Sequence, residues 1–146
     1  MKEEVIVLIV EDDDGHARLI EKNLRRASIT NTMLRFTDGQ QILEFLFCRG
    51  EGRKREHTPY LLLLDIRIPK LDGIEVLRQV KQDEELRKVP VIMLTTMDDP
   101  CDVEVCHKLG CSNYIVKPVD FDKFAEVLSR LGLFLKIVQI PHIKMV

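Results

Sequence analysis

Side chains that could handle a phosphoryl group follow four apolar segments of the chain. They are Glu11, Asp12, Asp13, Asp65, Thr95, Thr96 and Lys117. Taken singly, each has a plainer explanation. Residues 11–14 could be a solvated turn in which Asp14 or a neighbour caps a helix, and a lone aspartate or lysine is most often a surface residue. Their shared place at the ends of apolar segments favours a common site.

Carboxylates gathered in one place need a cation. If Glu11, Asp12 and Asp65 lie within about 5 Å of one another, each ionised pair costs on the order of 3 kcal/mol at an effective dielectric of about 20. Mg²⁺ offsets such repulsion, and it is held by one or two carboxylates together with carbonyl, water and phosphate oxygens. Three carboxylates, Mg²⁺ and Lys117 carry no net charge, so the predicted chemistry is transfer of a phosphoryl group.

Five short apolar segments predict the strands that would position these side chains. Residues 5–10 and 60–64 are apolar throughout and too short for buried helices, which is typical of parallel strands covered on both faces. Three further strands are predicted at residues 32–36, 90–94 and 113–116.

Helical spacing of apolar residues fills the intervals between the predicted strands. Helices are expected over residues 16–27, from residue 42 towards the loop at 50–59, over residues 74–80, from Asp99 to Gly110, and from Asp120 onwards. Alternating strands and helices with short connections predict an α/β fold with a doubly wound five-stranded parallel sheet. In such sheets the carboxyl ends of the strands form the functional crevice, so the charged side chains should share one site.

Composition excludes several other classes of function. A net charge of −2 with 45% hydrophobic and 32% charged residues predicts one globular domain. The basic triplet at residues 53–55 reads as a solvated loop, so no DNA partner is expected. No apolar run is long enough to cross a membrane and no signal peptide is recognisable, so we expect a cytoplasmic protein without a membrane partner.

Cysteine and glycine spacing offers no second site. Cys48, Cys101, Cys106 and Cys111 form no Cys-x-x-Cys pair, and one helix cannot aim the last three at a single zinc ion. Neither of the glycine-rich nucleotide-binding patterns is present.

The order of these motifs resembles the receiver domain of two-component response regulators along nearly the whole chain. The matching segments are residues 10–13, Leu64-Asp65 with Pro69 and Asp72-Gly73, Thr95, and Lys117-Pro118. The resemblance implies a flavodoxin-like three-layer sandwich with strand order 2-1-3-4-5. The loop at 50–59, the pair Thr95-Thr96, and residues 117–121 and 137–141 are most similar to single-domain regulators paired with cyanobacterial phytochrome kinases.

The resemblance also implies a role for each site residue. Asp65 would accept a phosphoryl group from a sensor histidine kinase, so the protein would be a phosphoacceptor and not a turnover enzyme. Glu11, Asp12, Asp65 and the backbone carbonyl of Arg67 would hold Mg²⁺. Lys117 would pair with Asp65, Thr95 would bind a phosphoryl oxygen, and Tyr114 would change rotamer with Thr95. By the same analogy the Lys117–Pro118 peptide would be cis.

The end of the chain suggests a homodimer. We expect residues 1–132 to form the receiver domain and residues 133–146 an extension, with no separate output domain. The apolar residues of the last helix and the extension could form an interface between two copies. The alternative is that the extension folds back over its own domain.

Two other functions compete with the phosphoacceptor. An aspartyl phosphatase of the haloacid dehalogenase type would need a second acid two residues after Asp65, where this chain has Arg67. A receiver-like module that is not phosphorylated would have no need of like-charged acids that destabilise the fold without metal.

Overall fold

The computed structural model describes residues 5–144 as five parallel strands, five α-helices and one 3₁₀ helix. In chain order they are β1 (Ile6–Val10), α1 (Asp14–Arg26), β2 (Met33–Phe36), α2 (Gly39–Leu46), β3 (Tyr60–Leu64), α3 (Gly73–Gln82), η1 (Leu86–Lys88), β4 (Val91–Thr95), α4 (Pro100–Leu109), β5 (Asn113–Val116) and α5 (Phe121–Leu135). The sheet order is β2-β1-β3-β4-β5. The predicted fold class and strand order are confirmed.

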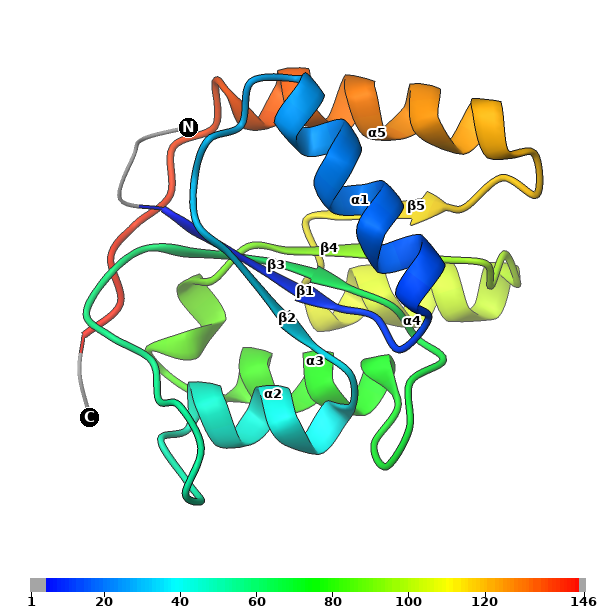
Figure 1. The fold of residues 1–146 in the computed structure, drawn as a ribbon. Helices are drawn as coiled ribbons and strands as arrows, with labels where there is room; N and C mark the ends of the chain where they lie inside the picture. The colour runs from blue at the N-terminus through cyan, green and yellow to red at the C-terminus, as the bar shows by residue number, and fades with distance from the viewer. Residues whose placement is uncertain (1–4, 145–146) are drawn as a thin grey trace.

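The sheet lies between two layers of helices, as Figure 1 shows. Helices α1 and α5 cover one face, and α2, α3 and α4 cover the other. Successive residues of a strand point to opposite faces, so Leu62 and Leu64 join one apolar cluster while Leu61 and Leu63 join the other. Both faces are therefore buried, which explains why the central strands are apolar throughout.

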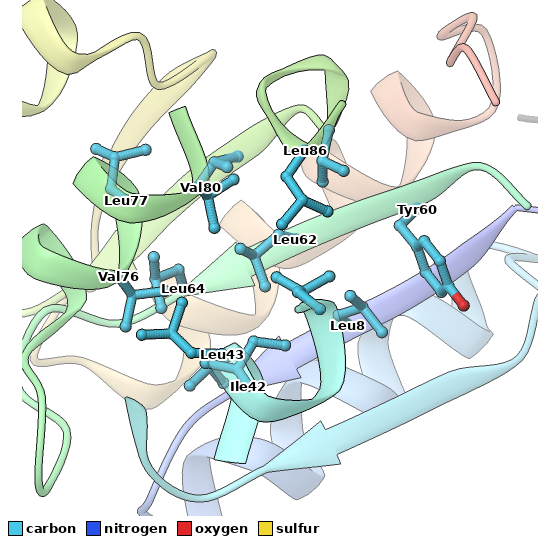
Figure 2. Packing of buried hydrophobic residues seen from close by; sticks show 14 of the residues in the cluster. Leu8, Ile42, Leu43, Tyr60, Leu62, Leu64, Val76, Leu77, Val80 and Leu86 are labelled. Carbon is cyan, nitrogen blue, oxygen red and sulfur yellow. The ribbon is translucent and has the colours of Figure 1, made fainter. Parts of the chain in front are cut away.

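Figure 2 shows the cluster on the α2 and α3 face. Leu8, Leu62 and Leu64 project from β1 and β3 between side chains of the two helices. Ile42 of α2 and Val76 of α3 are fully buried there. This packing holds β1 and β3 side by side, and it is at the ends of these two strands that the acidic residues follow.

An aspartate side chain caps the start of each α-helix by accepting hydrogen bonds from backbone N–H groups of the first turn. The caps are Asp13, Asp38, Asp72, Asp99 and Asp120. The predicted caps Asp99 and Asp120 are confirmed, and in residues 11–14 the cap is Asp13, not Asp14. Five of the 24 acidic residues therefore satisfy backbone N–H groups that helices leave unpaired.

The chain after α5 folds back along the domain, as the red segment in Figure 1 shows. Val138 and Ile140 pack on the α1 and α5 side of the sheet, and Ile143 is fully buried in the cluster on the opposite side. The Lys144 N–H donates to Glu85 Oε2 at 3.3 Å. Residues 136–144 thus fold back over their own domain, which is the alternative to the dimer given above. Helix α5 continues three residues beyond residue 132, the predicted end of the receiver domain.

Two further sequence expectations concern the backbone and membranes. No peptide bond within residues 5–144 is cis, so Lys117–Pro118 is trans and the expectation by analogy is wrong. The trans form is the ordinary preference of an X–Pro bond, by about 0.5–1 kcal/mol.

Within residues 5–144, no helix combines the length and the apolar character that spanning a membrane requires.

Candidate functional site

Four buried polar side chains meet at the carboxyl edge of the sheet. Glu11 follows β1, Asp65 follows β3, Thr95 ends β4 and Lys117 follows β5. Each exposes 7% or less of its surface. Burying charged groups costs several kcal/mol per ion unless they are paired, so these residues must be held together by specific contacts.

Lys117 is the centre of these contacts. Its Nζ donates to Asp65 Oδ2 at 2.9 Å and also to Glu11 Oε1. The Lys117 backbone N–H donates to the Thr95 carbonyl at 2.7 Å, which joins β5 to β4 at this edge. The predicted pair with Asp65 is present, and Glu11 is a second carboxylate on the same ammonium group.

The pKa of Glu11 is raised above its ordinary value. Burial is the largest cause, the contact with Lys117 opposes it, and the charge of Asp65 adds to the rise. Glu11 Oε2 also accepts the Asp13 N–H at 3.2 Å. The site thus confines two carboxylates around one ammonium group, and it attracts additional positive charge.

Asp65 is held by the backbone on both sides. Its N–H donates to the Val10 carbonyl at 3.2 Å, and its Oδ1 accepts the Arg67 N–H at 3.3 Å. Helix α3 begins so close that a Cβ on Gly73 would lie 2.2 Å from the Asp65 carbonyl oxygen. The turn pair Asp72-Gly73 therefore sets the approach of α3 to the acidic site.

Thr95 and Tyr114 meet at Met97. Thr95 Oγ1 accepts the Met97 N–H at 3.3 Å, and the Tyr114 hydroxyl donates to the Met97 carbonyl at 2.6 Å. Burial raises the pKa of Tyr114 to about 12, which keeps the hydroxyl a donor. On the solvent side, Arg67 Nε donates to Met97 Sδ at 2.8 Å. The two residues predicted to move together are thus connected through one intervening residue.

Not every predicted site residue lies inside the cluster. Asp12 is exposed at the mouth, and Asp13 caps α1 instead of joining the buried carboxylates. Across residues 5–144, no three His, Cys, Asp or Glu side chains are grouped closely enough to form a metal site by themselves. Mg²⁺ does not require such a group, because it takes only one or two carboxylates with carbonyl and water oxygens. The oxygen donors at this mouth fit that chemistry.

Sequence reasoning treated His16 only as the start of a helix. In the structure, its Nδ1 lies 3.2 Å from Lys117 Nζ and 3.7 Å from Glu11 Oε1. The ring also meets Phe124 of α5 edge to face, with 5.6 Å between ring centroids. The available signal was its position three residues after Asp13, which places it in the first turn of the helix that follows the acidic segment.

Comparison with known proteins assigns the family. The family model for the response regulator receiver domain matches residues 7–129. The chain belongs to the response regulator receiver family. Receiver domains accept phosphoryl groups in signalling, so the phosphoacceptor interpretation, rather than a turnover enzyme, is confirmed at the level of the family.

The relatives align with this chain over most of their own length. Response regulator Rcp1 from Synechocystis is 33% identical over 137 residues, covering 93% of this chain and 92% of Rcp1. A receiver domain structure from Rhodospirillum rubrum has a TM-score of 0.89 at 42% identity and covers 96% of this chain and 99% of its own. The phosphorylated cyanobacterial phytochrome response regulator RcpA has a TM-score of 0.82 at 28% identity, covering 93% of this chain and 97% of RcpA. Receiver domains bind divalent metal ions, and Rcp1 has a structure in its Mn²⁺-bound form.

Proposed function

We propose that this receiver domain takes a phosphoryl group from a sensor histidine kinase onto Asp65, and that phosphorylation switches its contacts with other proteins in the cytoplasm. The observation that carries the proposal is the buried Asp65 carboxylate, whose Oδ2 lies 2.9 Å from Lys117 Nζ at the carboxyl edge of the sheet. A single-domain regulator of residues 1–132 with an extension at 133–146 fits a chain that spans 92% of Rcp1.

Transfer begins with attack of an Asp65 carboxylate oxygen on the phosphorus of a phosphohistidine. The new O–P bond forms as the N–P bond breaks, and the kinase imidazole leaves. Lys117 then binds a phosphoryl oxygen in addition to Glu11. The Thr95 hydroxyl, which in the unphosphorylated structure accepts the Met97 N–H, is the group we assign to donate to a second phosphoryl oxygen. These donors stabilise charge on the equatorial oxygens.

Glu11, Asp12, Asp65 and the backbone carbonyl of Arg67 are the residues we assign to Mg²⁺. When bound, the ion supplies positive charge that offsets repulsion between the carboxylates and the incoming phosphoryl group. The exposed Asp12 lies on the solvent side of the buried Glu11 and Asp65, which suits a metal that keeps several of its waters.

Intact-protein mass measures the central step directly. The full chain and Asp65→Asn are exposed to acetyl phosphate and Mg²⁺, and to an autophosphorylated bacterial phytochrome kinase. We expect an adduct of about 80 Da, the mass of one phosphoryl group, on the unmodified chain alone. An adduct of equal yield on Asp65→Asn, or none on either protein with both donors, overturns the assignment. The second result would favour a receiver-like interaction module that is not phosphorylated.

We assign the switch to Thr95 and Tyr114. A phosphoryl oxygen that draws the Thr95 hydroxyl inward takes it from the Met97 N–H. Met97 also holds the Tyr114 hydroxyl, so its displacement would release Tyr114 and change the surface formed by α4 and β5.

The kinase is expected to dock beside the acidic mouth. A groove of about 470 Å³ between α1 and α5 is lined by Arg18, Leu19 and Lys22, with Phe121 at its α5 side. Relatives named as phytochrome regulators favour a kinase of that class as the donor. A phytochrome kinase should phosphorylate the protein faster than a kinase of another sensor class does, and equal rates would contradict this pairing.

A second copy of the chain is the partner we assign to the outer surface of α5. A hollow of about 340 Å³ lies against the edge strand β5 and is lined by Ile115, Val127, Leu131 and Phe134. Phe134 exposes 44% of its surface and Ile137 exposes 76%. The folded-back extension packs its Val138, Ile140 and Ile143 against the clusters beside the sheet, so it leaves Phe134 and Ile137 uncovered. The exposed apolar side chains of Phe134 and Ile137 favour an interface between copies.

Sedimentation of the full chain tests the dimer. We expect dimers at tens of micromolar, and monomers for Phe134→Glu, which places a charge in the apolar hollow. Asp122→Asn, at an exposed position of the same helix away from the hollow, is the control and should remain dimeric. An unmodified chain that stays monomeric with and without phosphorylation contradicts the proposal.

A further inference from the structure

The ammonium group of Lys117 is surrounded by three acceptors, one for each of its N–H bonds. Glu11 and Asp65 supply carboxylate oxygens, and the third atom is His16 Nδ1 at 3.2 Å. An ammonium group can only donate, so His16 Nδ1 serves as the third acceptor in the tautomer that carries no hydrogen on Nδ1. The Lys117 side chain exposes only 1% of its surface, so no bulk water replaces a missing acceptor.

His16 is itself held in place from two elements. Its backbone N–H donates to Asp13 Oδ1 at 2.9 Å, which caps α1. Its ring meets Phe124 edge to face, and Phe124 is buried on α5. The ring therefore has a defined position between the two helices of one face, with Nδ1 towards Lys117.

We propose that His16 is a positioning residue that holds Lys117 in the orientation needed to bind the incoming phosphoryl group. This inference rests on the proposed acceptor role of Asp65. During transfer, the Asp65 oxygen facing Lys117 must share the ammonium group with phosphoryl oxygens, so that one of the three contacts changes. Glu11 and His16 retain the other two. Because a lysine side chain has many rotamers, a third fixed acceptor reduces the ordering required in the transition state.

Two substitutions separate the hydrogen bond from the packing of the ring. His16→Phe keeps an aromatic ring against Phe124 but removes the acceptor. His16→Asn removes the ring but can place an amide oxygen near the position of Nδ1. A purely structural role predicts that phenylalanine is the milder change, whereas the positioning role predicts the opposite order.

The experiment follows the adduct of about 80 Da over time with acetyl phosphate and Mg²⁺ in the full chain and both variants. We expect the rate constant for His16→Phe to fall about tenfold, as for loss of one hydrogen bond to a charged group, while His16→Asn stays within about threefold of the unmodified chain. Thermal unfolding of the same samples ranks their stability. Rates that follow stability instead of the acceptor overturn the inference.

Failure of the inference differs from failure of the proposed function. If the unmodified chain gains no adduct with acetyl phosphate or a kinase, the acceptor role of Asp65 is overturned and the inference falls with it. If the unmodified chain is phosphorylated and His16→Phe reacts equally fast, only the positioning role of His16 is overturned.

Discussion

At the scale of single residues, the acidic site holds its charge in an arrangement that costs stability. Asp65 and Glu11 are both buried and share Lys117. One ammonium group cannot neutralise two carboxylates, and the pKa of Glu11 is raised chiefly by its burial and further by the charge of Asp65. A site that is unfavourable by itself has a strong preference for a cation, which couples metal binding to the chemistry at Asp65.

Asp65→Asn should therefore raise the melting temperature in the absence of Mg²⁺. The amide removes a buried charge and its repulsion of Glu11, yet it can still accept a hydrogen bond from Lys117. A gain of about 1 kcal/mol corresponds to about 3 °C for a domain of this size. Calorimetry with and without Mg²⁺ checks this, and Asp98→Asn, at an exposed position, should leave both values unchanged. Equal stabilisation by Mg²⁺ of the unmodified chain and Asp65→Asn would contradict the metal assignment.

Tyr114 offers an optical signal for the switch. The chain has two tyrosines and no tryptophan, and Tyr60 is buried at the first residue of β3, with its hydroxyl accepting the Glu56 N–H. Release of the Tyr114 hydroxyl from the Met97 carbonyl should increase tyrosine emission on phosphorylation. The increase should vanish in Tyr114→Phe and persist in Tyr60→Phe. Emission that changes equally in both variants would place the response elsewhere.

At the scale of elements, the connection from β3 to α3 determines where Asp65 lies. The Gly73 N–H donates to the Ile66 carbonyl at 2.8 Å, and the helix start approaches the Asp65 backbone without room for a side chain. The same loop carries the Arg67 carbonyl assigned to Mg²⁺. The position of α3 and the geometry of the acceptor are thus parts of one local structure.

Gly73→Ala should lower the free energy of unfolding by about 1–3 kcal/mol, because its Cβ would force the Asp65 carbonyl and α3 apart. Urea denaturation measures this loss. Gly52→Ala is the matched control, since a Cβ there meets no atom within 4 Å. If both variants unfold at the same urea concentration, the close approach of α3 to Asp65 is not a constraint on the fold.

At the scale of the whole molecule, the folded-back extension connects the two helical layers. It leaves α5 on one face, and Ile143 ends in the cluster formed with α2 and α3 on the other. The His142 ring also meets His57 of the loop before β3, with 6.0 Å between ring centroids. The extension is thus part of the packed domain, although α5 keeps exposed apolar residues on its outer surface.

Ile143→Ala should lower the free energy of unfolding by about 2 kcal/mol, because it removes a fully buried side chain from the core. Gln139→Ala changes an exposed polar residue of the same extension, and it should stay within about 0.5 kcal/mol of the unmodified chain. Chemical denaturation compares the three proteins. An equal loss for both variants would mean that the extension is not docked in solution.

Much of the fold was predictable because its signals are local. Runs such as residues 60–64 are apolar at every position, and only a strand buried on both faces needs that pattern. Aspartates before helices, such as Asp99 and Asp120, satisfy N–H groups within their own turns. The 3₁₀ helix η1 was missed, since its three residues are too few to show a period.

The sequence by itself determined which reactive side chain follows each strand. An acid follows β1 and β3, a hydroxyl ends β4 and an amine follows β5. Parallel strands carry such residues to one edge whatever the details of packing. Only the tertiary structure decided which of them touch. Lys117 contacts both Glu11 and His16, which lie 106 and 101 residues away along the chain. Contacts of that separation depend on how α1 and α5 pack against each other on one face of the sheet, and neither spacing nor periodicity encodes the distance between them.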